Sequence, residues 1–260
     1  MRGPWQSPET AGMTAAPTIE RATDAAVQKA HEETLPTRVA LERGRFATAM
    51  GVLGLFGFLG IFGAVRARRS EAFDLAMSLK LQHQRSPLLD RVMAAASWLG
   101  FPPQSRLIPP AIIATLFALR FRVEAGFEAL AWGTGLVSTL LKEVMKRPRP
   151  VAGEDLRVVV APLGGSSFPS GHVITYVGTY GFLAYLAHTL IRPVALRRAV
   201  VGGLGALLAL VGPSRIYQGH HWPTDVTASY MLGTSYVVAL TALYRRVKGD
   251  RRRARVIPPA

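Results

Sequence analysis

A stretch of twenty residues without a charged side chain, from Phe46 to Val65, constrains the fold of this chain more than any other feature. As an α-helix, the stretch is long enough to cross the roughly 30 Å hydrocarbon layer of a bilayer. Its glycines would weaken a helix in water, but small residues allow close helix packing in lipid. We therefore expect a membrane-spanning helix here.

Five further apolar blocks predict an all-α fold, a six-transmembrane-helix bundle. They run from Leu107 to Phe121, Gly126 to Leu141, Val173 to Ile191, Ala199 to Gly212 and Val226 to Tyr244. Residues 66–106 carry apolar side chains at helical spacing beside polar ones, which predicts an interfacial helical segment between the first and second spans. We expect a polar N-terminal tail (1–45) with a short helix around Glu20 to Glu33, a transmembrane domain (46–245) and a basic C-terminal tail (246–260).

The composition of the 260 residues excludes several functional classes. The chain has no cysteine, which rules out a disulfide framework, Cys-ligated zinc or iron–sulfur sites and thiol catalysis. Charged residues make up 18%, a low share that favours a membrane protein. The formal net charge of +15 is compatible with binding to a nucleic acid, to anionic lipid or to an anionic substrate. Only the distribution of the basic residues along the chain can decide among these partners.

That distribution indicates that the basic residues orient a membrane protein rather than bind nucleic acid. No apolar run lies near Met1, so we expect no cleaved signal peptide. Six spans place both termini on one side, and the cluster RRVKGDRRRAR after the last span favours cytoplasmic termini, although Lys and Arg are almost equally numerous on the two sides. We expect a multi-pass protein of a bacterial cell membrane, with the bilayer as its partner and its chemistry among the outer basic residues.

Three clusters of polar residues lie at the ends of the predicted spans. They are Lys142 with Arg149-Pro150, then Pro169-Ser170-Gly171-His172, and finally Ser214-Arg215 with His221 and Asp225. Taken singly, each has a structural explanation: a basic stop signal, a helix cap and a His–Asp cap.

Each cluster also has a functional interpretation. Exposed N–H groups at a helix start bind phosphate, and His172 could exchange a proton with it. Asp225 could accept one ring N–H of His221 and leave the other nitrogen as a nucleophile. Because successive spans alternate in direction, all three clusters fall on the same side of the membrane, although they are far apart in the sequence.

A metal site is the obvious alternative, since His172, His220, His221 and Asp225 are all possible ligands. However, Asp225 is the only carboxylate within the three clusters, and at least three cations lie with it. Such a site repels a divalent ion and attracts phosphate. We therefore expect metal-independent chemistry with no cofactor, and we regard His220 as a neighbour of the site rather than a participant.

The three clusters resemble the tripartite signature of the type 2 phosphatidic acid phosphatase (PAP2) superfamily, and the six spans resemble its membrane-bound lipid phosphatases. The resemblance covers roughly residues 46–245. It implies that His221 is the nucleophile and forms a phosphohistidine, that Asp225 orients it, and that His172 serves as acid and base. It implies the following phosphate-binding residues: Lys142, Arg149, Ser170, Gly171 and Arg215.

Two functions therefore remain open. The favoured one is hydrolysis of a terminal phosphate on a lipid phosphate or diphosphate, such as phosphatidylglycerophosphate, phosphatidic acid or undecaprenyl diphosphate. The alternative is a non-enzymatic lipid-phosphate binder or transporter that uses the same cations. The two histidines and Asp225 favour the enzyme, because a binder has no use for an oriented nucleophile. The sequence indicates neither the particular lipid nor the oligomeric state.

Overall fold

Helices account for all regular secondary structure in the described part of the chain, residues 38–153, 156–159 and 164–256 of the computed structural model, which confirms the all-α class. In chain order they are α2 (Arg38–Arg66), α3 (Glu71–His83), α4 (Pro87–Trp98), α5 (Gln104–Ala118), α6 (Arg122–Trp132), α7 (Thr134–Met145), α8 (Gly171–Leu190), α9 (Val194–Tyr217) and α10 (Pro223–Val256). The chain divides into two compact units, Met1–Phe46 and Ala47–Ala260, and the packing described below lies within the second.

The predicted segment boundaries differ from these helices at both ends. The helix expected around Glu20 to Glu33 lies outside the described residues. Helix α2 already begins at Arg38, inside the predicted tail and eight residues before the predicted start of the first span. At the other end, α10 continues to Val256 through the basic run, since Lys and Arg are good helix formers.

Among the described residues, three helices are long and apolar enough to cross a membrane by length and composition. They are Gly44–Arg66 within α2, Val194–Tyr217 in α9 and Pro223–Gly249 within α10. They coincide with the first, fifth and sixth predicted spans. The second predicted span corresponds to α5, which has only 15 residues, and the fourth to α8, whose 20 residues include two histidines and three tyrosines. The count of six spans therefore stays a prediction.

The third predicted span, Gly126 to Leu141, is not one continuous helix. It is divided at Gly133, where α6 ends and α7 begins. The Leu136 N–H donates to the Gly133 carbonyl at 3.0 Å, and the Thr134 hydroxyl donates to the Ala131 carbonyl at 2.9 Å. These bonds between residues three apart tighten the chain for one turn. Apolar residues continue through the break, so hydropathy gave no sign of it.

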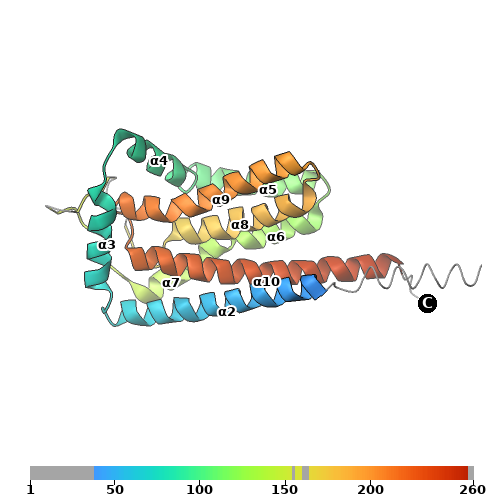
Figure 1. Cartoon of the computed structure of the whole chain (residues 1–260), viewed down its shortest axis with the longest axis horizontal. Helices are drawn as coiled ribbons and strands as arrows, with labels where there is room; N and C mark the ends of the chain where they lie inside the picture. The colour runs from blue at the N-terminus through green and yellow to red at the C-terminus, as the bar shows by residue number, and fades with distance from the viewer. Residues whose placement is uncertain (1–37, 154–155, 160–163, 257–260) are drawn as a thin grey trace, which may run out of the picture. The chain divides into compact units, whose positions relative to one another are not determined.

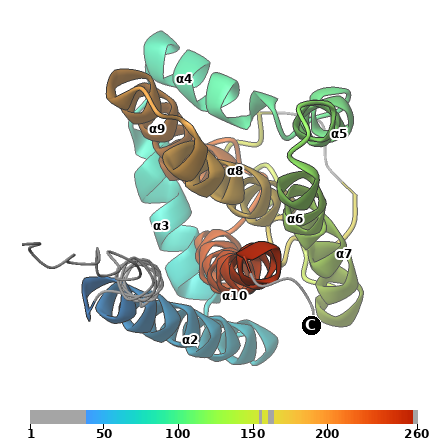
Figure 2. The same cartoon turned by 90° about the vertical axis from the view of Figure 1, so that its right-hand side faces the viewer.

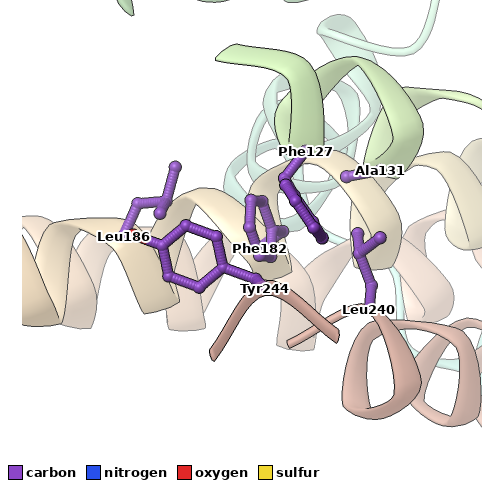
Figure 3. Close-up of a cluster of buried hydrophobic side chains, with 6 residues drawn as sticks. All are labelled: Phe127, Ala131, Phe182, Leu186, Leu240 and Tyr244. Atoms are coloured by element: carbon purple, nitrogen blue, oxygen red, sulfur yellow. The ribbon is translucent and has the colours of Figure 1, made fainter. Parts of the chain in front are cut away.

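Helix α8 is the central element of the second unit. It packs against α9, α10, α6 and α7, as Figure 2 shows in a view along the helices. One apolar cluster joins three of them, with Phe127 and Ala131 from α6, Phe182 and Leu186 from α8, and Leu240 and Tyr244 from α10 (Figure 3). A helix surrounded in this way is apolar on all sides, which explains the long apolar block in the sequence.

Helix α3 runs across one end of the long helices (Figure 1). Its buried side chains are polar, namely Asp74, Ser78 and Gln82, whereas Phe73 and Met77 are exposed. A helix beside water would have the opposite arrangement. The interfacial position expected for this segment stays a prediction, and an apolar outer face is what that position would require.

The crossing of α8 with the α6–α7 junction gives a first prediction. A Cβ atom at Gly178 would lie 2.4 Å from the Ala131 carbonyl oxygen, a backbone atom that cannot move aside. We expect Gly178→Ala to destabilise the protein by about 1–3 kcal/mol, measured as thermal unfolding in detergent. Gly202→Ala is the control, because a Cβ there meets nothing within 4 Å. Equal melting temperatures for the two variants would contradict this packing.

Candidate active site

His221 lies in the short loop between α9 and α10, and its side chain is buried. Its Nδ1 is 2.8 Å from the carbonyl oxygen of Ser167. A carbonyl can only accept, so Nδ1 carries the proton and donates it, and Nε2 keeps its lone pair. Burial, followed by the cations of Arg215 and Arg149, holds the pKa of His221 well below its usual range. The imidazole is therefore neutral near pH 7, with an unprotonated Nε2.

Asp225 is not the direct hydrogen-bond partner of His221 that the spacing suggested. Its Oδ2 lies 3.6 Å from His221 Nδ1, farther than the Ser167 carbonyl, and accepts the Trp222 N–H at 2.9 Å. A carboxylate in the first turn of α10 reaches back to the N–H before the helix, as in a capping box. Asp225 thus contributes a negative charge beside His221, while the backbone of Ser167 fixes the tautomer.

The other Asp225 oxygen accepts from Arg147, a residue that the sequence interpretation missed. Arg147 Nη1 donates to Asp225 Oδ1 at 2.6 Å, and its Nη2 donates to Asp74 Oδ2 at 2.5 Å. Asp74, on α3, also accepts from the N–H and the hydroxyl of Thr224. One guanidinium therefore joins two buried carboxylates, from α3 and from the start of α10. We call Asp74, Arg147 and Asp225 the carboxylate–arginine bridge.

Arg149 follows two residues later and faces His221. Its Nη1 lies 3.3 Å from His221 Nε2 and donates to the His220 carbonyl at 2.8 Å, and its Nη2 donates to the Ser166 carbonyl. Burial lowers the pKa of Arg149. This lowering still leaves the guanidinium charged near pH 7, so a cation lies where a phosphoryl group on His221 would carry negative charge.

Arg215, in the last turn of α9, is completely buried. Its Nη1 donates to Gln218 Oε1 at 2.9 Å and to Ser97 Oγ at 3.2 Å, and its Nη2 contacts His220 Nδ1. The Phe101 ring covers the guanidinium at 5.0 Å. Burial and the neighbouring Arg215 and Arg149 cations lower the pKa of His220 to about 3, so His220 is neutral and accepts from Arg215.

The second cluster forms the N-terminal end of α8. The Ser170 N–H donates to Ser229 Oγ at 2.8 Å, and Ser229 donates to the Asp225 carbonyl, so α8 and α10 are joined at their first turns. A Cβ at Gly171 would lie 3.6 Å from Lys142 Nζ, which places Lys142 next to this helix end. Lys142 also interacts electrostatically with Arg149, Arg215 and Asp225.

His172, in the first turn of α8, packs edge-on against Phe101, with ring centroids 4.8 Å apart. Gly100 permits this contact, since a Cβ there would come within 2.1 Å of the imidazole. His172 also interacts electrostatically with Arg215, His221 and Lys142. The structure thus brings all eight sequence-predicted site residues to one end of the second unit.

Several buried polar atoms of these residues have no hydrogen-bond partner within the described part of the chain. They are Ser170 Oγ, His172 Nε2, Arg149 Nε, Arg215 Nε and His220 Nε2. Buried polar groups are nearly always paired, so a cluster without partners indicates a site for a ligand. All five atoms can donate, and three of the side chains surrounding them are cations, which matches a phosphate group.

The missed residues differ in how visible they are in the sequence. Arg147 lies inside the run Lys-Arg-Pro-Arg, so its charge is evident, but its role depends on Asp74, which no motif marks. Ser167 acts through its backbone carbonyl, for which side-chain identity gives no signal. Phe101 lies in the connection from α4 to α5, beside a Gly and two prolines that mark only a turn.

The carboxylate–arginine bridge gives a second prediction. We expect Arg147→Gln to lose about 3–5 kcal/mol of stability, because two buried carboxylates lose their cation. Adding Asp74→Asn should restore part of the loss, since one uncompensated charge is then removed. Both are measured by thermal unfolding in detergent.

Arg157→Gln is the matched control for this experiment. It breaks the Arg157–Asp90 pair, whose side chains are 32% and 47% exposed, so water screens the pair and the loss of stability should be much smaller than for Arg147→Gln. If Arg147→Gln loses no more stability than the control, the bridge does not stabilise the active-site end of the second unit.

Comparisons with known proteins agree on one family. A family model described as the PAP2 superfamily matches residues 127–248, which include all three clusters. Phosphatidylglycerophosphatase B of Bacillus subtilis (strain 168) is 29% identical over 200 residues, 75% of this chain and 95% of that protein.

Solved structures point to the same family. The crystal structure of a transmembrane PAP2-type phosphatidylglycerolphosphate phosphatase from Bacillus subtilis is 27% identical, with a TM-score of 0.67 over 76% of this chain and 96% of that one. LpxE from Aquifex aeolicus, 24% identical, shares the fold, with a TM-score of 0.52 over 65% of this chain and 95% of that one. This chain is therefore similar in sequence and fold to membrane phosphatases of the PAP2 superfamily.

Proposed function

We propose that this protein is an integral-membrane lipid phosphatase that removes a terminal phosphate from a lipid phosphate or diphosphate through a phosphohistidine intermediate. One observation carries the proposal: the neutral, buried His221 presents an unprotonated Nε2 beside Arg149, among the other cations of the site. A non-enzymatic binder would need the cations but not this tautomer. The relatives named above supply the lipid character of the substrate.

The reaction proceeds in two displacements. Burial and then the Arg215 cation lower the pKa of His172, and the negative charge of a bound phosphate favours its protonated form. In the first displacement, His221 Nε2 attacks phosphorus, the bond from phosphorus to the leaving oxygen breaks, and the protonated His172 gives that oxygen a proton. In the second, His172 takes a proton from water, the water oxygen attacks phosphorus, and the N–P bond breaks. Inorganic phosphate leaves, and both histidines return to their starting states.

The surrounding groups stabilise the charge of the transition state. Arg149, Arg215 and Lys142 lie where the equatorial phosphoryl oxygens gather, with the Ser170 hydroxyl and the Gly171 N–H at the start of α8. As the N–P bond forms, the His221 ring becomes cationic. The Ser167 carbonyl and the Asp225 carboxylate then face the ring N–H and stabilise that charge.

The charge balance of the site favours catalysis without a metal. Its single motif carboxylate, Asp225, already binds Arg147, and the groups that remain around the five unpartnered atoms are cationic or neutral. A divalent ion would therefore be repelled at the position where phosphate is attracted. We further propose that the termini are cytoplasmic and that the active site opens on the outer face of a bacterial membrane, where a lipid headgroup can enter.

The nucleophile is tested directly by phosphate release in detergent with EDTA present. We expect His221→Ala to lose at least about 10³-fold in kcat, because the covalent step is removed. Wild-type protein should also become labelled when it is incubated briefly with a ³²P-labelled lipid phosphate and quenched in a denaturant without acid. The label should be labile in acid and stable in base, as a phosphohistidine is.

His188→Ala serves as the control, because His188 is an exposed histidine near the far end of α8. It should keep full activity. Equal release by wild type and His221→Ala would overturn the mechanism, and activity that EDTA abolishes and added metal restores would overturn metal independence.

Membrane orientation is testable because the natural chain has no cysteine, so each introduced one is unique. We expect Gly153→Cys, in the exposed connection before α8, to react with a membrane-impermeant maleimide on intact cells. Arg192→Cys, in the exposed turn between α8 and α9, should react only after permeabilisation. The reverse pattern would place the active site on the cytoplasmic face.

A further inference from the structure

Two buried arginines at the active-site end are held in opposite ways. Arg147 donates to Asp74 and Asp225, so two carboxylates surround its charge. Arg215 is completely buried, yet no ion pair joins it to a carboxylate in the part of the chain that the structure describes. Buried charges are normally paired with an opposite charge. The charge of Arg215 is therefore left uncompensated, although the side chain is held firmly.

Neutral groups hold the Arg215 guanidinium in place. Its Nη1 donates to Gln218 Oε1 at 2.9 Å and to Ser97 Oγ at 3.2 Å, and its Nη2 donates to His220 Nδ1. The Phe101 ring covers the charge at 5.0 Å. Burial lowers the pKa of His220 to about 3, so its imidazole is neutral near pH 7 and accepts through Nδ1. We call Gln218, Ser97, His220 and Phe101 the neutral clamp.

The neutral clamp is continuous with the loop that carries His221. The N–H groups of His220 and His221 both donate to the Arg215 carbonyl, at 3.0 and 3.3 Å. The carbonyl of His220 accepts from Arg149 Nη1 at 2.8 Å. Gly219 makes the turn just before His220 with a φ of 71°, a conformation that favours glycine. His220 therefore contacts both arginines and fixes them relative to His221.

The charge of Arg215 acts on the two histidines of the proposed reaction. After burial, it is the largest cause that lowers the pKa of His172 and of His221. Charges interact more strongly in a protein interior than in water, so Arg215 also attracts an anion that is bound at His221. A carboxylate in the neutral clamp would orient the guanidinium equally well, but it would cancel most of this attraction.

We propose that Gln218 and His220 are positioning residues that hold Arg215 without neutralising it, so that its full positive charge acts on a phosphoryl group at His221. This role rests on the proposed phosphatase function. It makes His220 part of the phosphate-binding machinery, whereas the sequence interpretation regarded it as a neighbour of the site. Phosphate affinity then depends on the charge of the neutral clamp and not only on its hydrogen bonds.

The test changes the charge of the neutral clamp and keeps its shape. Gln218→Glu replaces an amide by a carboxylate of the same size against Arg215 Nη1. The Kd of inorganic phosphate is measured from its protection of the full-length protein against thermal unfolding in detergent. We expect Gln218→Glu to weaken phosphate binding at least about tenfold, because the carboxylate cancels the Arg215 charge and repels the anion. His220→Asp should do the same at Nη2, so the result does not depend on the folding of one variant.

Three further variants separate charge from structure. His220→Asn keeps a neutral acceptor at the position of Nδ1 and should bind phosphate within about threefold of the wild type. His220→Leu leaves an Arg215 N–H unpaired, so it should unfold at a lower temperature than His220→Asp but bind phosphate more tightly, since the charge stays uncompensated. His83→Asp makes the same substitution as His220→Asp at an exposed residue in the last turn of α3, and should keep the wild-type Kd.

The outcomes separate the role of the neutral clamp from the proposed function. If Gln218→Glu and His220→Asp keep the wild-type Kd, or if phosphate affinity simply follows melting temperature across the variants, the role is wrong and the phosphatase stands. If the wild type binds phosphate with the expected dependence on charge but releases none from a lipid phosphate, the phosphatase is wrong and the charge effect stands. A wild type that binds no phosphate overturns both.

Discussion

The geometry of the active-site end depends on one guanidinium placed between two buried carboxylates. Asp74 and Asp225 are both buried, and Arg147 donates to each of them, so one cation compensates two carboxylates that are removed from water. The bridge joins α3 and the start of α10 to the segment after α7. That segment also carries Arg149. The bridge therefore determines where Arg149 and the loop that carries His221 lie relative to one another.

Backbone hydrogen bonds connect the carboxylate–arginine bridge to His221. Arg147 and Ser167 are joined by a hydrogen bond from the Ser167 N–H to the Arg147 carbonyl at 2.9 Å, and the Ser167 carbonyl in turn accepts from His221. The tautomer of His221 is therefore fixed by the backbone of Ser167, and the bridge holds that backbone in place through Arg147. A carbonyl has no pKa to shift, so it holds the proton on Nδ1 at any pH at which the protein is folded, while Asp225 supplies charge.

The sequence predicted the all-α class and which residues lie together, but not the contacts around them. Lys142, His172, Arg215 and His221 lie at or near helix ends, and because successive helices reverse direction, hydropathy alone predicts that they fall on the same side. The Arg147–Asp74 pair could not be predicted in this way, since its partners are 73 residues apart and no motif includes Asp74. Gly133 divides a helix within an apolar run, where hydropathy does not change. The sequence shows that α3 has polar residues at helical spacing. It does not show that they face inward, because that depends on the contact between Asp74 and Arg147.

Helix α8 joins the candidate site to the apolar core of the second unit. Its first turn carries Gly171 and His172, two of the residues that the sequence signature marks. Farther along the same helix, Phe182 and Leu186 pack with residues of α6 and α10 in one apolar cluster. The first turn of α8 therefore lies where apolar packing along the rest of the helix places it. Motifs at helix ends predict which residues gather, and the apolar helix faces determine where they gather.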